Sequence, residues 1–191
     1  MNPALPDISA QNPTAREAGG AGGVLSREQF AERFRESSRA LWCIAASVSR
    51  DRAGAEDAVQ EAAVIALGKI EEFNPTTNFI AWMGQIVRFV AMNSARTSAR
   101  RERILRQNAS DDLQHDAAEQ AWGLSPAMNT ALETLEPTVR ACLLLRVVAG
   151  MSYQQISGVL EIPEGTAMSH VFRARKALAS RLEDPSKGGA G

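Results

Sequence analysis

The sequence predicts an all-α fold, with two small helical domains joined by a flexible linker. Apolar residues recur every three or four positions through most of the chain, which is the period of an amphipathic helix. Two Ser-x-x-Gln capping boxes begin at Ser26 and Ser152, and each indicates the start of a helix. No stretch of any length alternates apolar and polar residues in the way that indicates a strand.

Composition divides the 191 residues into five parts. Residues 1–25 hold several prolines and a glycine-rich run, so we expect a disordered tail. A helical domain is expected over 26–106 and a second over 125–183, with an acidic linker over 107–124 and a short disordered tail over 184–191. The formal net charge is only −1, but the charges form blocks, with six arginines and one acid over 88–106 and no Lys or Arg over 107–139. Such alternation suits two nucleic-acid-binding units separated by a solvated linker.

The first domain is predicted to begin with a helix at Ser26. Its expected buried stripe consists of Phe30, Phe34, Leu41, Ile44, Ala45 and Val48. A break is expected over 49–54, followed by a helix over 55–70. The expected apolar face of that second helix consists of Val59, Ala63, Ala66, Leu67 and Ile70.

The second helix carries a polar stripe on its other side. Asp57, Gln60, Glu61 and Val64 follow one another at i, i+3, i+4 and i+7, which places them on one face. From the residues alone, a solvated helix surface is the simpler interpretation, and a docking surface is the alternative.

A loop over 73–78 and a long helix over 79–106 complete the first domain. The Asn74-Pro75 pair indicates a turn, and Asn78 is the expected N-cap of the helix. The first half of this helix is apolar, with Trp82, Met83, Ile86, Val87 and Val90. The second half is basic, with Arg96, Arg100, Arg101, Arg103 and Arg106. This division predicts an element that leaves a core and reaches an anion such as nucleic acid.

The second domain is predicted to hold four helices. Pro126 after Ser125 marks the start of a short helix to Leu135, because proline suits the first helical position. Another helix is expected from Pro137 to near Gly150. Its expected core face consists of Leu143, Leu144, Val147 and Val148.

The last two helices have the pattern of a helix-turn-helix. Ser152 caps the first helix, Pro163 interrupts it, and a second helix is expected over 164–182. Its apolar stripe consists of Ala167, Val171, Ala174 and Leu178. Its other side carries Thr166, Met168, Ser169, His170, Phe172, Arg173, Arg175 and Lys176. Because residues 169–181 hold four cations and no acid, DNA binding is favoured over an αα-hairpin with a solvated basic face.

Cysteine usage and hydropathy narrow the class of protein. Cys43 and Cys142 each lie in an apolar helical stretch, so both are expected to be buried, without a disulfide or a metal. His115 and His170 lack metal-ligand spacing, and no glycine-rich nucleotide loop is present. We therefore expect no metal, no cofactor and no enzymatic activity. No apolar run is long enough to span a membrane and no signal peptide is present, so a cytoplasmic location is expected.

Two separated blocks resemble one family. A-E-D-A-V-Q-E at 55–61, F-I-A-W-M-G-Q-I-V-R at 79–88 and the Arg100-Arg101 pair resemble region 2 of extracytoplasmic-function (ECF) sigma factors. L-E-P-T-V-R-A-C-L-L-L-R at 135–146, together with the helix-turn-helix, resembles their region 4. The resemblance implies a sigma factor that binds RNA polymerase core and promoter DNA, with an anti-sigma factor as a further candidate partner. A helix-turn-helix regulator of the response-regulator output type is the alternative, although 29–106 shows no receiver-domain pattern.

The resemblance also implies roles for particular residues. Asp57, Gln60 and Glu61 would bind the polymerase. The −10 element would be bound by Asn74, Asn78, Arg88, Phe89, Asn93, Arg96, Arg100 and Arg101. The −35 element would be bound by Thr166, Met168, Ser169, His170, Phe172, Arg173, Arg175 and Lys176.

The chain departs from the family's usual residues at four positions. Phe89 stands where Asn is usual, so it either joins the core or reshapes the pocket for a −10 base. Met168 and His170 stand where Lys or Arg is common. Glu161 stands where a turn glycine is usual, which leaves the geometry of the turn open.

Overall fold

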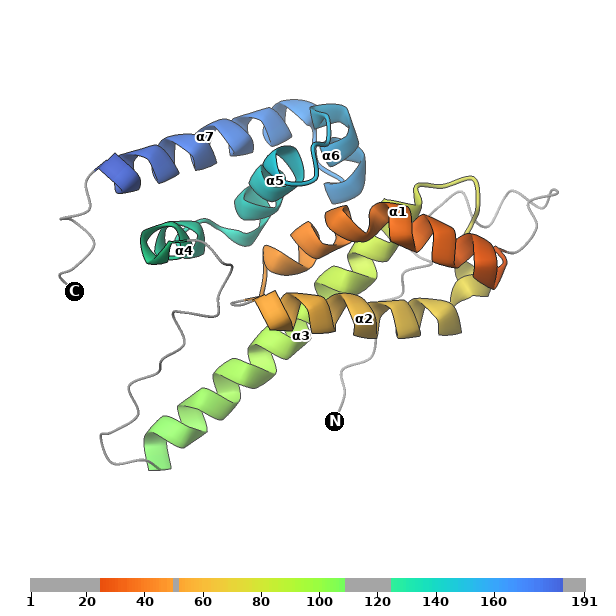
Figure 1. Cartoon of the computed structure of the whole chain (residues 1–191), viewed down its shortest axis with the longest axis horizontal. Coiled ribbons are helices and arrows are strands. Elements are labelled where there is room, and N and C mark those ends of the chain that lie inside the picture. The colour runs from red at the N-terminus through yellow and green to blue at the C-terminus, as the bar shows by residue number, and fades with distance from the viewer. Residues whose placement is uncertain (1–24, 50–51, 109–124, 184–191) are drawn as a thin grey trace.

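The computed structural model describes residues 25–49, 52–108 and 125–183, and these residues form seven α-helices, one 3-10 turn and no strand. The N-terminal half consists of α1 (Arg27–Ala46), α2 (Arg52–Gly68), the 3-10 turn η2 (Ile70–Glu72) and α3 (Phe79–Asn108). The C-terminal half consists of α4 (Pro126–Glu133), α5 (Pro137–Val147), α6 (Tyr153–Leu160) and α7 (Glu164–Glu183). Figure 1 shows the two groups side by side, with α7 along one edge and the end of α3 projecting from the other. The all-α prediction is confirmed.

Side-chain caps set the helix starts where the sequence predicts them. Ser26 Oγ accepts a hydrogen bond from the Gln29 amide at 3.2 Å, and Gln29 Oε1 accepts one from the Ser26 amide at 3.0 Å. Ser152 and Gln155 form the same reciprocal pair at 3.1 and 2.8 Å. Ser125 Oγ accepts from the Met128 amide at 3.3 Å. Each cap satisfies backbone donors that the first helical turn leaves without partners.

The core of the N-terminal half lies where α1, α2 and α3 meet. Met83 and Ile86 of α3 and Leu41 of α1 are completely buried. At Gly84 a Cβ atom would lie only 2.9 Å from Ile44 Cδ1, so the absence of a side chain lets α3 lie close to α1. The prediction that the apolar first half of α3 is buried is confirmed.

The α2 helix begins three residues earlier and ends two residues earlier than predicted, at Arg52 and Gly68. It begins at Arg52, so the last three residues of the expected break are helical, and an Arg52–Glu56 ion pair of 2.7 Å spans its first turn. Leu67 was expected to be buried and is 41% exposed. The buried face consists instead of Ala55, Ala58, Val59, Ala62 and Ala66. Small side chains form this face because α2 packs against both α1 and α3.

The α5 helix also buries a different set of residues from the one predicted. Val147 and Val148 are 57% and 41% exposed, whereas Leu145 is completely buried. The reason is that α5 packs against α1, α6 and α7 at once, so it buries more than one face of its middle turns. The helix ends at Val147, before Gly150, which has a left-handed φ of +72°. Val147 and Val148 therefore lie on the exposed side of the end of α5.

Other helix ends differ slightly from the expected positions. The short helix α4 ends at Glu133 rather than Leu135, and α3 continues to Asn108, two residues into the expected linker. The remainder of the expected linker and both expected tails lie outside the described residues. The side chain of Arg140 in α5 donates hydrogen bonds of 3.0 Å to the Glu133 and Leu135 carbonyls, which holds the end of α4 against α5.

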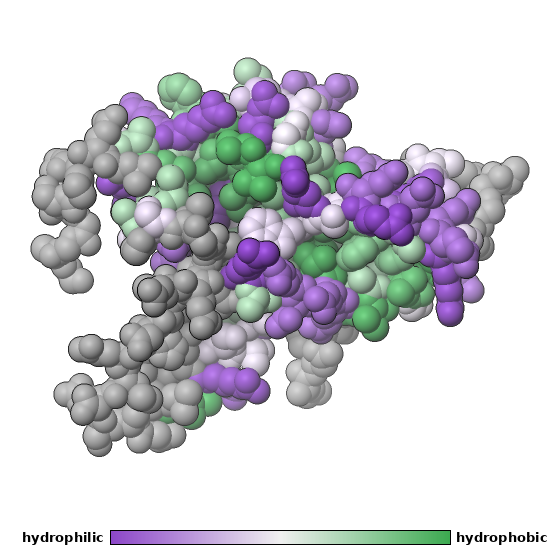
Figure 2. Space-filling model, viewed as in Figure 1, coloured by the Kyte–Doolittle hydropathy of each residue, from purple (hydrophilic) through white to green (hydrophobic). Residues whose placement is uncertain are grey.

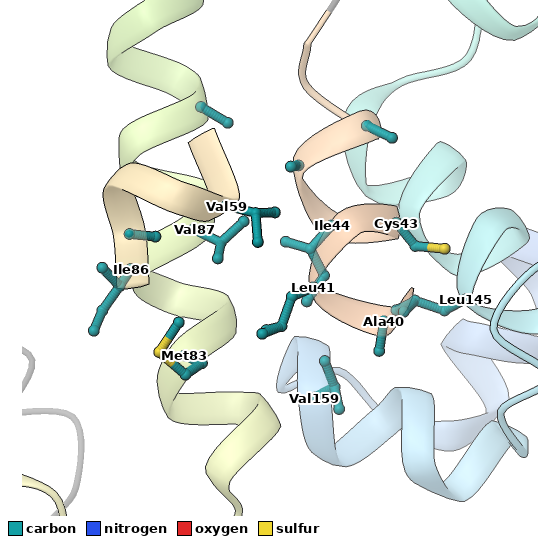
Figure 3. Close-up of a cluster of buried hydrophobic side chains, with 14 of the residues drawn as sticks. Ala40, Leu41, Cys43, Ile44, Val59, Met83, Ile86, Val87, Leu145 and Val159 are labelled. Atoms are coloured by element: carbon teal, nitrogen blue, oxygen red, sulfur yellow. The ribbon is translucent and has the colours of Figure 1, made fainter. Parts of the chain in front are cut away.

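The two halves share a hydrophobic seam, defined here by Ala40, Leu41 and Cys43 of α1, Leu145 of α5 and Val159 of α6. Figure 3 shows α1 between α3 on one side and α5 and α6 on the other. The Cys43 thiol donates a hydrogen bond of 3.6 Å to the Leu144 carbonyl, across the seam. All five seam residues belong to one continuous cluster of buried side chains. In this structure the two halves therefore pack on each other rather than standing apart.

Candidate nucleic-acid and protein interfaces

The predicted stripe on α2 is a free surface within the described part of the chain. Asp57, Gln60 and Glu61 are exposed, and Val64 is 72% exposed. These four residues are called the α2 stripe below. Its opposite face is the alanine-rich surface that packs against α1 and α3. The core therefore holds the helix rigidly while the α2 stripe faces outward.

The loop between η2 and α3 is ordered by its own side chains. Asn74 Oδ1 accepts hydrogen bonds from the amide and the hydroxyl of Thr76, at 3.0 and 2.8 Å. Asn78 Oδ1 accepts from the Ile80 and Ala81 amides at 3.0 and 3.2 Å, which confirms it as the N-cap of α3. Both asparagine oxygens are therefore used within the protein. The amide NH2 groups are the ends of these side chains that remain to donate to a ligand.

A cluster of aromatic side chains packs at the start of this loop. Phe73 is 3% exposed, and its ring centroid lies 5.6 Å from that of Phe79 and 4.9 Å from that of Trp82. The Arg33 guanidinium lies 5.9 Å from the centre of the Phe73 ring. This rigid cluster of aromatic side chains fixes the loop backbone relative to the start of α3.

One face of α3 changes character along its length. Phe89, Asn93, Arg96, Arg100 and Arg103 fall at i, i+4, i+7, i+11 and i+14, so they share this face. Phe89 is half-buried and packs against the core, and Asn93 is half-buried too. The three arginines are exposed, on the part of α3 that projects from the body in Figure 1. Arg103, which was not among the predicted site residues, shares this exposed face because it is three residues after Arg100.

Two predicted −10 residues do not lie on that face. Arg88 is half-buried, one position before Phe89, and Arg101 is exposed, one position after Arg100. Each lies about 100° around the helix from its neighbour. A ligand that contacts all of these residues must therefore wrap around α3 rather than follow a single line.

The outer surface of α7 is backed by a closely packed stripe. Ala167, Val171 and Ala174 are at most 1% exposed, as predicted. On the outer side, Met168 is 50% exposed and Phe172 70% exposed. The predicted residues Ser169, Arg173, Arg175 and Lys176 are exposed, and Thr166 and His170 are half-buried. The structure thus brings all eight predicted residues to the accessible side of one helix.

Hydrogen bonds order three of these outward side chains. Arg173 Nη2 and His170 Nδ1 lie 2.6 Å apart and form a hydrogen bond. The Ser169 hydroxyl donates to the Gly165 carbonyl at 2.8 Å. No carboxylate among the residues that the structure describes forms an ion pair with Arg173, Arg175 or Lys176. The positive charge of the helix is therefore available to an external anion.

The turn between α6 and α7 takes the left-handed geometry without a glycine. Glu161 has φ 55° and ψ 42°, and is the only residue other than glycine with positive φ in the described ranges. This conformation costs an L-residue about 1–2 kcal/mol. The Ser157 hydroxyl donates a hydrogen bond of 2.6 Å to the Ile162 carbonyl and holds the turn closed. The turn geometry that the sequence left open is therefore that of a tight helix-turn-helix.

Burial governs the chemistry of both cysteines. Desolvation raises the pKa of the Cys43 thiol to about 12, and that of Cys142 to about 11. A thiol is a poor nucleophile and a poor metal ligand while it is protonated. Within residues 25–49, 52–108 and 125–183 there is no cluster of side chains suited to a metal ion. None of the helices in these same residues is long and apolar enough to span a membrane.

Comparisons with known proteins assign both halves to one family. The sigma-70 region 2 family matches residues 33–101, and the sigma-70 region 4 family matches residues 127–178. The chain is 26% identical over 169 residues to the ECF RNA polymerase sigma factor SigE of Mycolicibacterium smegmatis, covering 84% of this chain and 64% of that protein. It is 29% identical over 142 residues to the ECF sigma factor EcfG of Rhodopseudomonas palustris, covering 74% of this chain and 78% of that protein. The chain thus spans less than two thirds of the Mycolicibacterium relative.

Solved structures share the arrangement of helices. The sigma factor RpoE of Bartonella quintana, solved in complex with the anti-sigma factor NepR, has a TM-score of 0.60 and 26% identity. That match covers 82% of this chain and 98% of the other. CnrH, solved with the cytosolic domain of CnrY, has a TM-score of 0.58 over 94% of this chain and 97% of the other; at 21% identity it shows the fold alone. The chain belongs to the sigma-70 family of RNA polymerase sigma factors, in its ECF group.

Proposed function

We propose that this sigma factor binds RNA polymerase core through the α2 stripe and promoter DNA through α3 and α7. It acts in the cytoplasm as a transcription initiation factor without catalysis of its own. The observation that supports this most strongly is the presence of both sigma-70 regions, in order, on one chain. The response-regulator alternative does not account for the region 2 match. Because RpoE was solved with NepR, an anti-sigma factor is a further proposed partner.

The α2 stripe is suited to docking on a protein. It places the acidic side chains of Asp57 and Glu61 beside Val64, an exposed apolar residue, on a helix held by its other face. Charged groups then guide the encounter with a basic partner, and the apolar group adds buried area on contact. The fixed helix loses little conformational entropy when it binds.

The loop at 73–78 and the shared face of α3 are suited to a single strand. The Asn74 and Asn78 amides supply donors for a base edge, and the exposed arginines of α3 supply cations for the adjacent phosphates. Extracting a base from the stack costs a few kcal/mol, so contacts to the base must return that free energy. The half-buried Phe89 belongs to the support of this surface, because it packs against the core.

The outer surface of α7 is suited to duplex DNA. In a helix-turn-helix the second helix lies in the major groove, with its N-terminal residues at the base edges. Thr166, Met168 and Ser169 occupy that end of α7, and Arg173, Arg175 and Lys176 follow. Residues near the start of α7 would read bases, and the later cations would bind phosphates.

The docking proposal is tested by a double variant of the α2 stripe. Gln60→Lys with Glu61→Lys adds three positive charges, and should abolish co-purification with core polymerase while leaving the helical circular dichroism unchanged. The matched control is Glu32→Lys with Glu36→Gln, which adds the same charge to an exposed part of α1. The control should retain polymerase binding. Equal binding by both folded variants would refute the docking role of the α2 stripe.

The assignment of the two DNA elements is tested by in vitro transcription. The full-length chain with core polymerase would transcribe a library of templates with randomised −10 and −35 elements. Arg96→Ala with Arg100→Ala should weaken selection at −10, and Arg173→Ala should weaken it at −35. A variant that weakens selection at the element assigned to the other helix would contradict the assignment.

A further inference from the structure

The outer surface of α7 carries two large apolar side chains that the protein leaves in solvent. Met168 and Phe172 are 50% and 70% exposed, and they are four residues apart, so they lie next to each other on one face. Single exposed apolar residues are ordinary. An adjacent pair on a helix whose cations form no ion pair with a described carboxylate is a less common arrangement and indicates a contact surface. In Figure 2, apolar side chains project between hydrophilic ones along the edge formed by α7.

The pair occupies one flank of the outward surface. Met168 and Phe172 each follow a residue of the buried stripe, Ala167 and Val171, so they lie about 100° around the helix from the core. His170 and Arg173, joined by their hydrogen bond of 2.6 Å, lie on the opposite flank. Exposed Arg175, which follows the buried Ala174, lies on the same flank as Met168 and Phe172, so the apolar pair has a cation beside it. The opposite flank is polar and cationic.

An apolar flank has one type of apolar group to contact in the major groove. Base edges there present hydrogen-bond donors and acceptors, and the one apolar group they present is the C5 methyl of thymine. Contact with that methyl removes apolar surface of both partners from water. A cationic side chain at position 168 would place a charge against this apolar methyl, whereas methionine is flexible and adapts to an irregular apolar surface.

We propose that Met168 and Phe172 recognise thymine methyl groups in the −35 element, so that this sigma factor selects thymine at the steps that face this flank. The proposal rests on the −35 role proposed for α7. The cations beside the pair favour DNA over a protein as the occupant, because Arg173, Arg175 and Lys176 complement phosphates.

The test replaces thymine by deoxyuracil, which removes the methyl group and leaves the base pairing unchanged. One randomised promoter library is amplified with dTTP and the same library with dUTP. The full-length chain bound to core polymerase then selects from each. The chains compared are the wild type, Met168→Ala, Phe172→Ala and the control Val147→Ala. Val147 is a matched control because it is also an exposed apolar residue of the C-terminal half, but lies at the end of α5.

We expect the wild type and Val147→Ala to select thymine in the −35 element of the first library. Affinity for the selected site should fall about fourfold for each contacted methyl when uracil replaces thymine. Met168→Ala and Phe172→Ala should each lose part of this dependence and should bind both forms more equally. Polymerase binding without DNA should be unchanged in all four chains.

Three other results would each overturn the thymine proposal, and one of them would also overturn the −35 role of α7. A wild type that selects the same −35 sequence with equal affinity from both libraries overturns the thymine proposal and leaves the −35 role intact. Selection of no −35 sequence from either library overturns the −35 role itself, and the thymine proposal with it. Loss of polymerase binding by Phe172→Ala in the absence of DNA would assign the apolar pair to a protein contact instead.

Discussion

The helices α3 and α7 both bury an apolar surface and display a basic one, but they divide the two in different ways. In α3 the division runs along the helix, with Met83 and Ile86 completely buried and Arg96 and Arg100 exposed several turns later. In α7 the division runs around the helix, and buried and exposed residues alternate within each turn. The end of α3 projects into solvent, whereas α7 lies along the body of the protein (Figure 1).

The two helices therefore differ in how far their binding residues lie from the buried residues that stabilise the fold. In α3 a change to an arginine lies far from the core, so binding can be altered without affecting folding. In α7 each of the eight predicted binding residues is within one turn of buried Ala167 or Ala174, so the position of the binding surface depends on the packing behind it. A helix that is backed in this way loses less freedom on binding rigid duplex DNA, and a projecting helix can adjust to a flexible single strand.

The largest effect should come from the buried half of α3. Met83→Ala should lower the free energy of unfolding by about 2–5 kcal/mol, because it leaves a cavity in the core. Arg100→Ala, on the projecting half, should change it by no more than about 0.5 kcal/mol. Urea unfolding followed by circular dichroism measures both. Similar losses for the two variants would contradict the division along α3.

A smaller effect should come from overpacking behind α7. Ala174→Leu forces extra volume into a completely buried site and should cost about 1–3 kcal/mol of unfolding free energy. The same substitution at exposed Ala179 should be neutral within about 0.5 kcal/mol. Thermal and urea unfolding of the two variants provide the comparison. Equal stability would show that the division around α7 does not control packing.

The salt dependence of DNA binding should sharpen the distinction between the flanks of α7. A cation that reaches a phosphate steepens the slope of log affinity against log salt by about 0.9 on duplex DNA. His170→Arg, on the cationic flank, should therefore steepen the slope by about 0.9. Met168→Lys should steepen it less, because the proposed thymine contact places this position at a base edge. Anisotropy titrations of the full-length chain on one labelled duplex measure both slopes, and identical changes would refute the orientation given to α7.

The smallest effect should come from the turn before α7. Glu161→Gly removes the cost of a left-handed residue, about 1–2 kcal/mol, but adds freedom to the unfolded chain worth about 0.4–1 kcal/mol. The net gain in unfolding free energy should be about 0.5–1 kcal/mol, with DNA affinity unchanged because the backbone of the turn is kept. The urea midpoint reports the gain. A loss of stability would show that the Glu161 side chain makes a contribution that outweighs its backbone strain.

Local signals were sufficient to predict much of the fold. Helix starts at Ser26, Asn78, Ser125 and Ser152 follow from side chains that bond to backbone amides only a few residues away. The buried stripe of α7 follows from helical period, because this helix rests on the core with a single face. The exposed state of the α2 stripe and the outward set on α7 follow from the same period.

Features that depend on several neighbours were not predictable in this way. Val147 and Val148 fit an apolar stripe in sequence, but the packing of α5 against α1, α6 and α7 buries other residues of this helix, such as Leu145. Leu67 is exposed because the small side chains of Ala62 and Ala66 bring α2 close to its neighbours along another line. The half-buried state of Phe89 and the contact of α1 with α5 involve residues distant in sequence, which no periodic pattern specifies.

The seam between the halves has a thermodynamic consequence. Cys43 and Leu145 would be exposed to water if one half unfolded while the other stayed intact, since each is covered by the opposite half (Figure 3). Partial unfolding would therefore forfeit burial on both sides of the seam, which disfavours half-folded species and makes the two halves cooperative. By the same coupling, a ligand that binds one half in this arrangement also raises the free energy needed to unfold the other.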